Sequence, residues 1–118
     1  MSEPLVSVII PSYERFDSLL IAIESIENQT YKNYEVIIVD DASKDKRYKG
    51  LNKNKNLRII HLEKNSVEMK GYFSDSIRNH GIKHASGKYI AFLDDDDYWF
   101  PEKLELQVKK LETTDFRM

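Results

Sequence analysis

The chain is 118 residues long, which suits a single domain with a hydrophobic core. Its composition is 41% hydrophobic and 32% charged, as in ordinary globular proteins, and a formal net charge of −2 excludes the strongly basic surface of a typical nucleic-acid-binding protein. The absence of cysteine excludes disulfides and thiolate metal sites, and no apolar run reaches the ~18 residues of a membrane span.

The first part of the chain alternates apolar segments with one amphipathic segment. Residues 5–10 (LVSVII) are typical of a buried strand, which we expect to stop at residues 11–13 (PSY), where the chain turns away. Residues 17–28 carry apolar side chains at helical spacing and predict a helix. Residues 34–39 (YEVIIV) predict a second buried strand, which runs directly into a pair of aspartates at 40–41.

The second part continues the alternation after a polar stretch. Residues 44–55 are basic and rich in asparagine, which favours a solvated loop or short helix without a binding role. Residues 57–62 predict a third strand, and their mixed polarity places it at a sheet edge. A helix is expected over 72–84, a fourth strand over 88–93, and a last helix from Pro101, a residue well tolerated in a first helical turn.

Two glycines accompany the second predicted helix. Gly81 lies inside it, where glycine costs about 1 kcal/mol relative to alanine, so we expect close backbone packing or a kink. Gly87 follows the helix and suits a C-terminal cap.

The order of elements predicts the fold class. Short apolar strands separated by helices indicate an α/β domain with a mostly parallel, doubly wound (Rossmann-like) sheet in a three-layer α/β/α arrangement. Ligands of such sheets bind beyond the carboxyl ends of the strands. Three predicted strands end in polar groups suited to a ligand: Pro11, Ser12 and Tyr13 after the first, Asp40 and Asp41 after the second, and Asp94, Asp95, Asp96 and Asp97 after the fourth.

The run of four aspartates is the strongest chemical signal. Adjacent carboxylates repel, so a counter-ion is expected, and their hard oxygen ligands suit Mg²⁺ or Mn²⁺. In an extended segment side chains alternate, which would place Asp94 and Asp96 on one face and Asp95 and Asp97 on the other. Two carboxylates on one face can share a cation that neutralises a diphosphate, so the residues alone predict metal-assisted handling of a phosphorylated ligand.

Plainer interpretations stand beside these. The acidic run could be a solvated turn, or could place acids at a helix N-terminus. Tyr13 could stack on a nucleobase or simply pack, and Arg78 could contact an anionic ligand or form a surface ion pair. The glycine-rich phosphate-binding motifs and the nucleophile motifs of hydrolases are absent from the sequence.

Three segments resemble the N-terminal half of a family 2 glycosyltransferase with the GT-A fold. They are VSVIIPSYER (6–15), SIENQTYKNYEVIIVDDAS (25–43) and RNHGIKHASGKYIAFLDDDDYWFPEKLELQ (78–107), and the last is the most specific. The resemblance implies that residues 1–118 form the nucleotide-sugar-binding part of the domain.

The resemblance also implies roles for residues near the nucleoside. Pro11, Ser12 and Tyr13 match the segment that holds the base and ribose. Asp40 and Asp41 match the pair after the second strand, one member of which usually contacts the base.

For the diphosphate end, the resemblance points to the later residues. Arg78 matches an arginine that often reaches the nucleotide. Asp94 and Asp96 match the outer acids of the D-x-D motif, so Asp96 is the first expected ligand of Mn²⁺ or Mg²⁺ and Asp94 the second. Asp95 stays an alternative for the supporting contact, and Asp97 is expected only to cap or charge the start of the last helix.

The implied activity is metal-dependent transfer of a sugar from a nucleoside-diphosphate sugar, with a UDP-sugar expected, to an acceptor hydroxyl with inversion, in polysaccharide or glycoconjugate synthesis. Ala42 and Ile77 depart from the family pattern, which usually has Gly and Ala there. The resemblance implies that the acceptor-binding half and the catalytic base of the family lie beyond residue 118, since no residue of this chain corresponds to that base. We therefore expect this chain to bind donor and metal only.

The expected setting follows from the N-terminus and the resemblance. Residues 1–4 (MSEP) lack the pattern of a secretory signal, so we expect a cytoplasmic location, at the inner face of the membrane if a region beyond residue 118 associates with it. The expected partners are the donor and an acceptor sugar or glycolipid, without nucleic acid.

Other protein classes share parts of this pattern. A Mg²⁺-dependent receiver-like signalling domain also has clustered aspartates on a doubly wound sheet, but it places an acid pair after the first strand, where this chain has Pro-Ser-Tyr. A nucleotidyltransferase would show a glycine-rich basic loop there. A non-catalytic module would bind saccharide without nucleotide.

Overall fold

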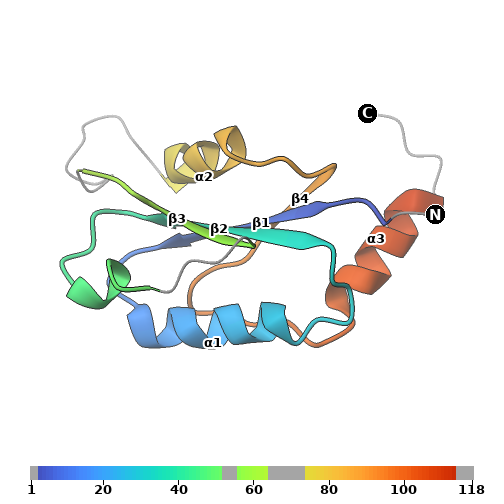
Figure 1. Ribbon diagram of the computed structural model, residues 1–118, viewed down its shortest axis with the longest axis horizontal. Helices are drawn as coiled ribbons and strands as arrows, with labels where there is room; N and C mark the ends of the chain where they lie inside the picture. The colour runs from blue at the N-terminus through green and yellow to red at the C-terminus, as the bar shows by residue number, and fades with distance from the viewer. Residues whose placement is uncertain (1–2, 52–55, 64–73, 114–118) are drawn as a thin grey trace.

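The computed structural model describes residues 3–51, 56–63 and 74–113 (Figure 1). Residues 72 and 73, the start of the second predicted helix, therefore lie outside the described part. The elements, in chain order, are β1 (Val6–Ser12), α1 (Phe16–Glu27), β2 (Tyr34–Asp40), the 3₁₀ helix η1 (Lys46–Tyr48), β3 (Leu57–His61), α2 (Ser74–Lys83), β4 (Tyr89–Phe92) and α3 (Lys103–Thr113).

The four strands form one parallel sheet in the order β3-β2-β1-β4. β1 lies in the middle and pairs with β2 from Val6 opposite Tyr34 to Ser12 opposite Asp40. β3 is an edge strand, as its mixed polarity predicted. Because all strands run the same way, the polar residues that follow β1, β2 and β4 meet at one edge of the sheet.

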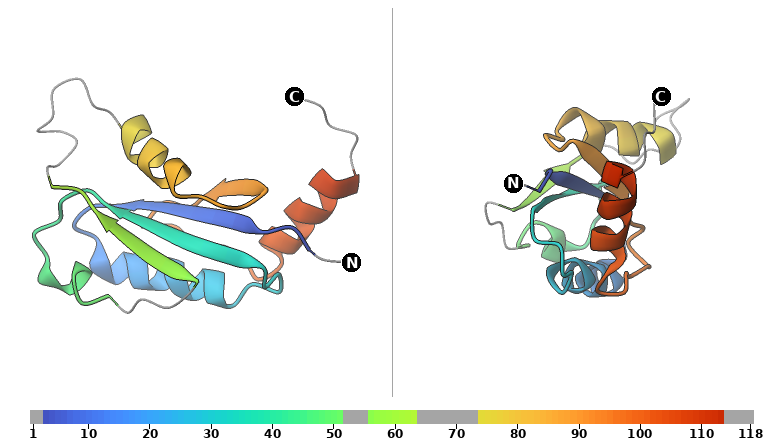
Figure 2. Two further views of the ribbon diagram at one scale, coloured as in Figure 1. Left: turned by 45° about the horizontal axis from the view of Figure 1, so that its top comes forward. Right: turned by 90° about the vertical axis from the view of Figure 1, so that its right-hand side faces the viewer.

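The sheet is the middle layer of three. Helices α1 and α2 cover opposite faces, and α3 lies against the end of the sheet where β1 begins (Figures 1 and 2). The larger core cluster joins the α1 face of the sheet to α1 and α3, and a smaller one lies under α2 and includes Ile37, Val39 and Ile77. The α/β fold class predicted from the sequence is confirmed. Within the described residues, none of the helices combines the length and apolar character needed to cross a bilayer.

Several predicted boundaries were wrong by a few residues. β1 continues through Pro11 to Ser12, and Pro11 is tolerated because the pairing of β1 with β4 has already ended at Ile9. Residues 101–102 form a turn, and α3 begins at Lys103.

Both glycines serve close packing of the chain on β1. A Cβ on Gly81 would lie 2.5 Å from Cγ2 of Ile9, which confirms the close approach of α2 to the sheet. A Cβ on Gly87 would lie 2.7 Å from the backbone nitrogen of Ser7 and 2.8 Å from the carbonyl oxygen of Leu5. The prediction of Gly87 as a cap was wrong, because α2 ends at Lys83 and Gly87 is required where the chain passes against β1.

Gln29 fastens the segment that follows the four aspartates to the end of α1. Its buried side chain donates from Nε2 to the carbonyl oxygen of Phe100 at 2.7 Å and accepts at Oε1 from the backbone N–H of Leu104 at 2.9 Å. The backbone N–H of Thr30 donates to the carbonyl oxygen of Pro101 at 2.9 Å. These bonds fix the chain as it returns from the cleft edge to α3.

Candidate functional site

A cleft of about 370 Å³ opens at the carboxyl ends of β1, β2 and β4. Its lining contains residues 11–13, Asp41, Arg78 and residues 94–96, all of which the sequence had indicated as candidates. Arg15 and Ile77 also line it. The cleft therefore gathers side chains from three strand ends and from α2, which lie far apart in the sequence.

The two aspartates after β2 have different surroundings. Asp40 is buried, its Oδ2 lies 2.9 Å from Nδ1 of His61, and its Oδ1 accepts from the backbone N–H of Ser43 at 3.0 Å. Asp40 is absent from the lining of the cleft, whereas Asp41 belongs to it. Of this pair, only Asp41 belongs to the cleft lining, although it is itself just 5% exposed.

Ser12 and Tyr13 also divide their roles. The Ser12 hydroxyl is buried, donates to Oδ2 of Asp95 at 2.9 Å, and lies 2.6 Å from the Tyr48 hydroxyl. Ser12 thus links the end of β1 to η1 and to the segment after β4. The Tyr13 side chain is 44% exposed, which fits a ring available to a ligand better than one packed in the core.

The four aspartates form a turn at the mouth of the cleft. The backbone N–H of Asp97 donates to the carbonyl oxygen of Asp94 at 3.1 Å, so the chain folds back after β4. The predicted alternation of faces was wrong for Asp97, because a turn replaces the extended segment on which it depended. Asp94, Asp96 and Asp97 are all exposed, and only Asp95 points inward.

Asp95 is bound to the protein on several sides. It is 6% exposed, accepts from the Ser12 hydroxyl and, at 3.2 Å, from the backbone N–H of Tyr13, and its Oδ1 lies 3.5 Å from Nη1 of Arg15. This carboxylate ties β1 to the acidic turn.

The remaining three carboxylates suit a divalent cation. One oxygen from each of Asp94, Asp96 and Asp97 lies within 4.8 Å of the others. Carboxylate oxygens that are exposed, convergent and beside an open cleft are the donor set that Mg²⁺ and Mn²⁺ prefer. The residues fit such an ion, with Asp97 in a position that the sequence assigned to a helix cap.

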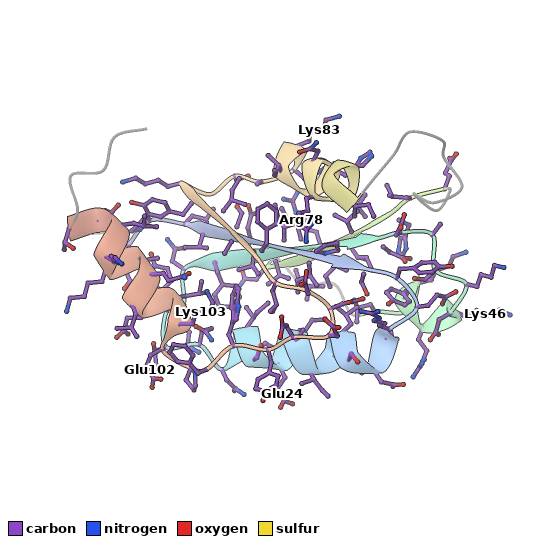
Figure 3. All side chains as sticks on the ribbon, turned by 180° about the vertical axis from the view of Figure 1, so that it is seen from behind. Glu24, Lys46, Arg78, Lys83, Glu102 and Lys103 are labelled. Carbon is purple, nitrogen blue, oxygen red and sulfur yellow. The ribbon has the colours of Figure 1, made fainter. Side chains whose placement is uncertain are left out.

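Two arginines form ion pairs with carboxylates of the acidic turn and offset part of its negative charge. Nη1 of Arg15 lies 3.1 Å from Oδ2 of Asp96, and Nη2 of Arg78 lies 3.4 Å from Oδ1 of Asp94. Arg78 extends from α2 beside the segment that leaves β4 (Figure 3), with its guanidinium 5.7 Å from the ring centre of Phe92. The structure thus shows Arg78 in an ion pair, as one of the two interpretations expected, and both partners of this pair line the cleft.

Two residues that support the cleft were missed by the sequence reasoning. Arg15 stands among ordinary surface charges in the sequence, and only the fold brings it to the acidic turn. Tyr48 lies in the stretch expected to be solvated, yet it is buried, and its hydroxyl accepts from the backbone N–H of Arg15 at 3.0 Å. A lone aromatic residue in a basic stretch was the available signal for Tyr48.

The loops at the rim of the cleft use strained backbone. Glu14 and Ala42 have positive φ values of 51° and 60°. The Glu14 carboxylate accepts from the backbone N–H groups of Lys44 at 2.9 Å and Asp45 at 3.2 Å, which joins the loop after β1 to the loop after β2. At the position of Ala42 the family pattern usually has glycine. The positive φ at this position explains the preference, because glycine adopts such a φ without strain.

The sequence of the chain is similar to those of known glycosyltransferases. The sequence model of the family described as Glycosyl transferase family 2 matches residues 7–118. The chain is 46% identical to an uncharacterized glycosyltransferase of Rickettsia bellii over 94% of this chain and 16% of the relative. It is 45% identical to the UDP-Glc:alpha-D-GlcNAc-diphosphoundecaprenol beta-1,3-glucosyltransferase WfaP of Escherichia coli, over 92% of this chain and 42% of that enzyme.

Solved structures share the fold. The crystal structure of S. aureus TarS 1-349 in complex with UDP-GlcNAc matches with a TM-score of 0.77 and 29% identity, over 91% of this chain and 31% of TarS. The complex of the same protein with UDP matches with a TM-score of 0.74. The chain spans less than half the length of these relatives.

Proposed function

Because the chain belongs to glycosyl transferase family 2, we propose that it is the donor-binding part of an enzyme that transfers a sugar from a nucleoside-diphosphate sugar. The observation that carries this proposal is the cleft at the carboxyl ends of the strands, which has an exposed aromatic ring and Asp41 beside the convergent carboxylates of the acidic turn. These are groups of the kinds needed to hold a nucleoside and a diphosphate.

The nucleoside would occupy the side of the cleft formed by the ends of β1 and β2. Tyr13 offers a ring for stacking, and Asp41, which lines the cleft although it is only 5% exposed, would accept a hydrogen bond from the base or ribose at its exposed side. Pro11 and Ser12 shape the floor between them. Asp40 would act indirectly, since its bonds to His61 and Ser43 set the turn that presents Asp41.

The diphosphate would lie at the acidic turn. Asp96, Asp94 and Asp97 would hold Mg²⁺ or Mn²⁺, with Asp96 as the first choice, and the bound cation would neutralise the nucleoside diphosphate as it leaves. Asp95 would not bind the cation directly, because it is 6% exposed and its Oδ2 already accepts from Ser12 and Tyr13. Arg78 could follow the diphosphate from its present partner Asp94.

The proposal also covers the complete transfer reaction, with its donor, acceptor and stereochemistry. We propose an inverting transfer from a UDP-sugar to an acceptor hydroxyl, with the catalytic base supplied from outside these 118 residues. The name of WfaP gives UDP-Glc as the donor and alpha-D-GlcNAc-diphosphoundecaprenol as the acceptor, and TarS binds UDP-GlcNAc. Both relatives support a UDP-sugar donor and a role in glycoconjugate synthesis. A glycolipid acceptor would place the enzyme at the cytoplasmic face of a membrane.

Titration calorimetry with UDP, GDP and dTDP, each with and without Mn²⁺, tests the proposal. We expect UDP to bind in a Mn²⁺-dependent way and Asp96→Ala to weaken that binding at least tenfold. Glu24→Ala is the matched control, because it removes the same charge from α1, outside the cleft lining (Figure 3). The proposal fails if none of the nucleotides binds the folded chain, or if Asp96→Ala binds as the wild type does.

Two further measurements, treatment with acetyl phosphate and titration with sugars, separate the other protein classes. A receiver-like domain would be phosphorylated on one aspartate by acetyl phosphate, and a saccharide-binding module would bind sugar without a nucleotide. The family match and the glycosyltransferase relatives favour sugar transfer over both classes and over a nucleotidyltransferase.

A further inference from the structure

The side chain of Arg15 lies in the cleft beside the candidate cation site. Its guanidinium is 3.1 Å from Asp96 and 3.5 Å from Asp95, and it lines the same cleft as both carboxylates. Asp96 is also one of the three exposed carboxylates that converge on a possible cation site. The Asp96 carboxylate therefore has two alternative positive partners, the Arg15 guanidinium and a divalent ion.

Arg15 is built to keep its backbone fixed while its side chain changes partner. Its N–H donates to the Tyr48 hydroxyl, and its carbonyl oxygen accepts from the backbone N–H of Leu19 at 2.8 Å, within the first turn of α1. The side chain, by contrast, is 57% exposed. A long, exposed side chain on a fixed backbone can move by rotation about its own bonds.

The two aspartates beside Arg15 depend on it to different extents. Asp95 keeps the Ser12 hydroxyl and the Tyr13 N–H as partners if the guanidinium leaves. Asp96 is 56% exposed and can exchange the guanidinium for another cation without any change in the core. The departure of Arg15 would thus free a ligand and leave the wall of the cleft intact.

We propose that Arg15 is an exchangeable counter-ion: it neutralises Asp96 in the ligand-free protein and passes to the diphosphate of the donor when a divalent cation takes its place. This inference rests on the proposed function. A guanidinium and a divalent cation repel each other, so an ion at Asp96 displaces Arg15. The planar guanidinium then matches phosphate oxygens in the same cleft.

The exchange links the two binding events. Without a nucleotide, the cation must displace Arg15 from Asp96, and the guanidinium gains no new anionic partner. With a nucleoside diphosphate present, the displaced guanidinium finds phosphate oxygens, so each ligand strengthens the binding of the other. A residue that only braced the turn would not link the ligands in this way.

Removal of the Arg15 charge should therefore move two affinities in opposite directions. In Arg15→Ala, Mn²⁺ alone should bind about fivefold tighter, because a competing positive charge is gone. UDP in the presence of saturating Mn²⁺ should bind about tenfold weaker, because charge-assisted hydrogen bonds to the diphosphate are lost. Uridine, which has no phosphate, should bind as it does to the wild type.

The measurement is Mn²⁺ binding by the loss of the free-ion EPR signal, followed by calorimetric titration of UDP. Arg47→Ala is the matched control, because Arg47 is 53% exposed, pairs with Asp17 and Asp45, and does not line the cleft. It should leave both affinities within about twofold of the wild type. Arg15→Gln keeps most of the side chain without the charge and should repeat the result if Arg15→Ala does not fold.

The outcomes separate the two proposals. Opposite changes in the two affinities support the exchange. If wild-type protein binds UDP with Mn²⁺ but the uncharged Arg15 variants change neither affinity, or weaken both, the exchange is wrong and the proposed function stands. If wild-type protein binds none of UDP, GDP and dTDP, the proposed function fails and the exchange fails with it.

Discussion

The same substitution at two neighbouring aspartates of the acidic turn should affect two different properties, stability at Asp95 and ligand binding at Asp96. Asp95→Ala removes a buried carboxylate that accepts from the Ser12 hydroxyl at 2.9 Å and from the Tyr13 N–H at 3.2 Å. Asp96→Ala removes an exposed carboxylate whose ion pair with Arg15 joins two side chains that are more than half exposed. The first should cost stability, and the second should cost ligand binding.

The magnitudes follow from these contacts. A hydrogen bond to a charged group contributes about 1.5–3 kcal/mol, but Ser12 keeps its contact with Tyr48 and the loss of a negative charge relieves repulsion within the turn. Asp95→Ala should therefore lower the free energy of unfolding by about 2–4 kcal/mol. An exposed ion pair contributes about 0–1 kcal/mol, and the loss of a negative charge again relieves repulsion. Asp96→Ala should therefore change the free energy of unfolding by less than about 0.5 kcal/mol.

Urea denaturation at neutral pH with a chelator present measures both values without any contribution from bound metal. Asp95→Asn is a useful third variant, because it keeps an acceptor for Ser12 and should lose only about 1–2 kcal/mol. The reasoning would be refuted if Asp96→Ala destabilised the chain as much as Asp95→Ala does. It would also be refuted if Asp95→Ala kept wild-type stability.

Three further substitutions test other parts of the structure. Ala42→Gly should raise the free energy of unfolding by about 0.5–1 kcal/mol in urea denaturation, since it relieves a φ of 60°; a loss of stability would contradict this. Gln29→Ala should lower it by about 2–3 kcal/mol, because its buried bonds to residues 100 and 104 are lost; an unchanged midpoint would contradict that role. A hydrogen bond from Lys88 lowers the pKa of Glu112 below its ordinary value, so this pair stabilises the fold above that value and loses its contribution as the pH falls. Melting temperatures measured from about pH 6 to 3 should therefore fall less steeply in Glu112→Gln than in the wild type, and parallel curves would exclude the pair as a source of acid lability.

The sheet and the location of the cleft could be predicted from the sequence because they depend on repeated local patterns. Apolar β-branched runs separated by helical spacing define parallel strands, and parallel strands bring their carboxyl ends to one edge. Asp41, Tyr13 and the acidic turn then follow from their positions directly after strands. The chain's membership of the family confirms the resemblance that its motifs showed.

The finer roles could not be predicted because they depend on contacts between distant segments. Nothing in four consecutive aspartates indicates that Asp95 turns inward, since this follows from a turn after β4 and from a partner, Ser12, at the end of β1. Arg15 and Tyr48 were missed for the same reason. The expectation of a cap at Gly87 failed because a local rule for helix ends competed with the close approach of the chain to β1.

The most direct test of the account is to locate bound Mn²⁺ by its paramagnetic broadening of backbone amide signals in the NMR spectrum, with UDP present and Mg²⁺ as the diamagnetic reference. The account predicts the strongest broadening at residues 94–97, with Tyr13 and Arg15 next. The amides of Glu3 and Glu112, at the end of the sheet where β1 and β4 begin, should be least affected. Broadening centred away from the acidic turn, or equal at both edges, would contradict the assignment of this cleft as the donor site.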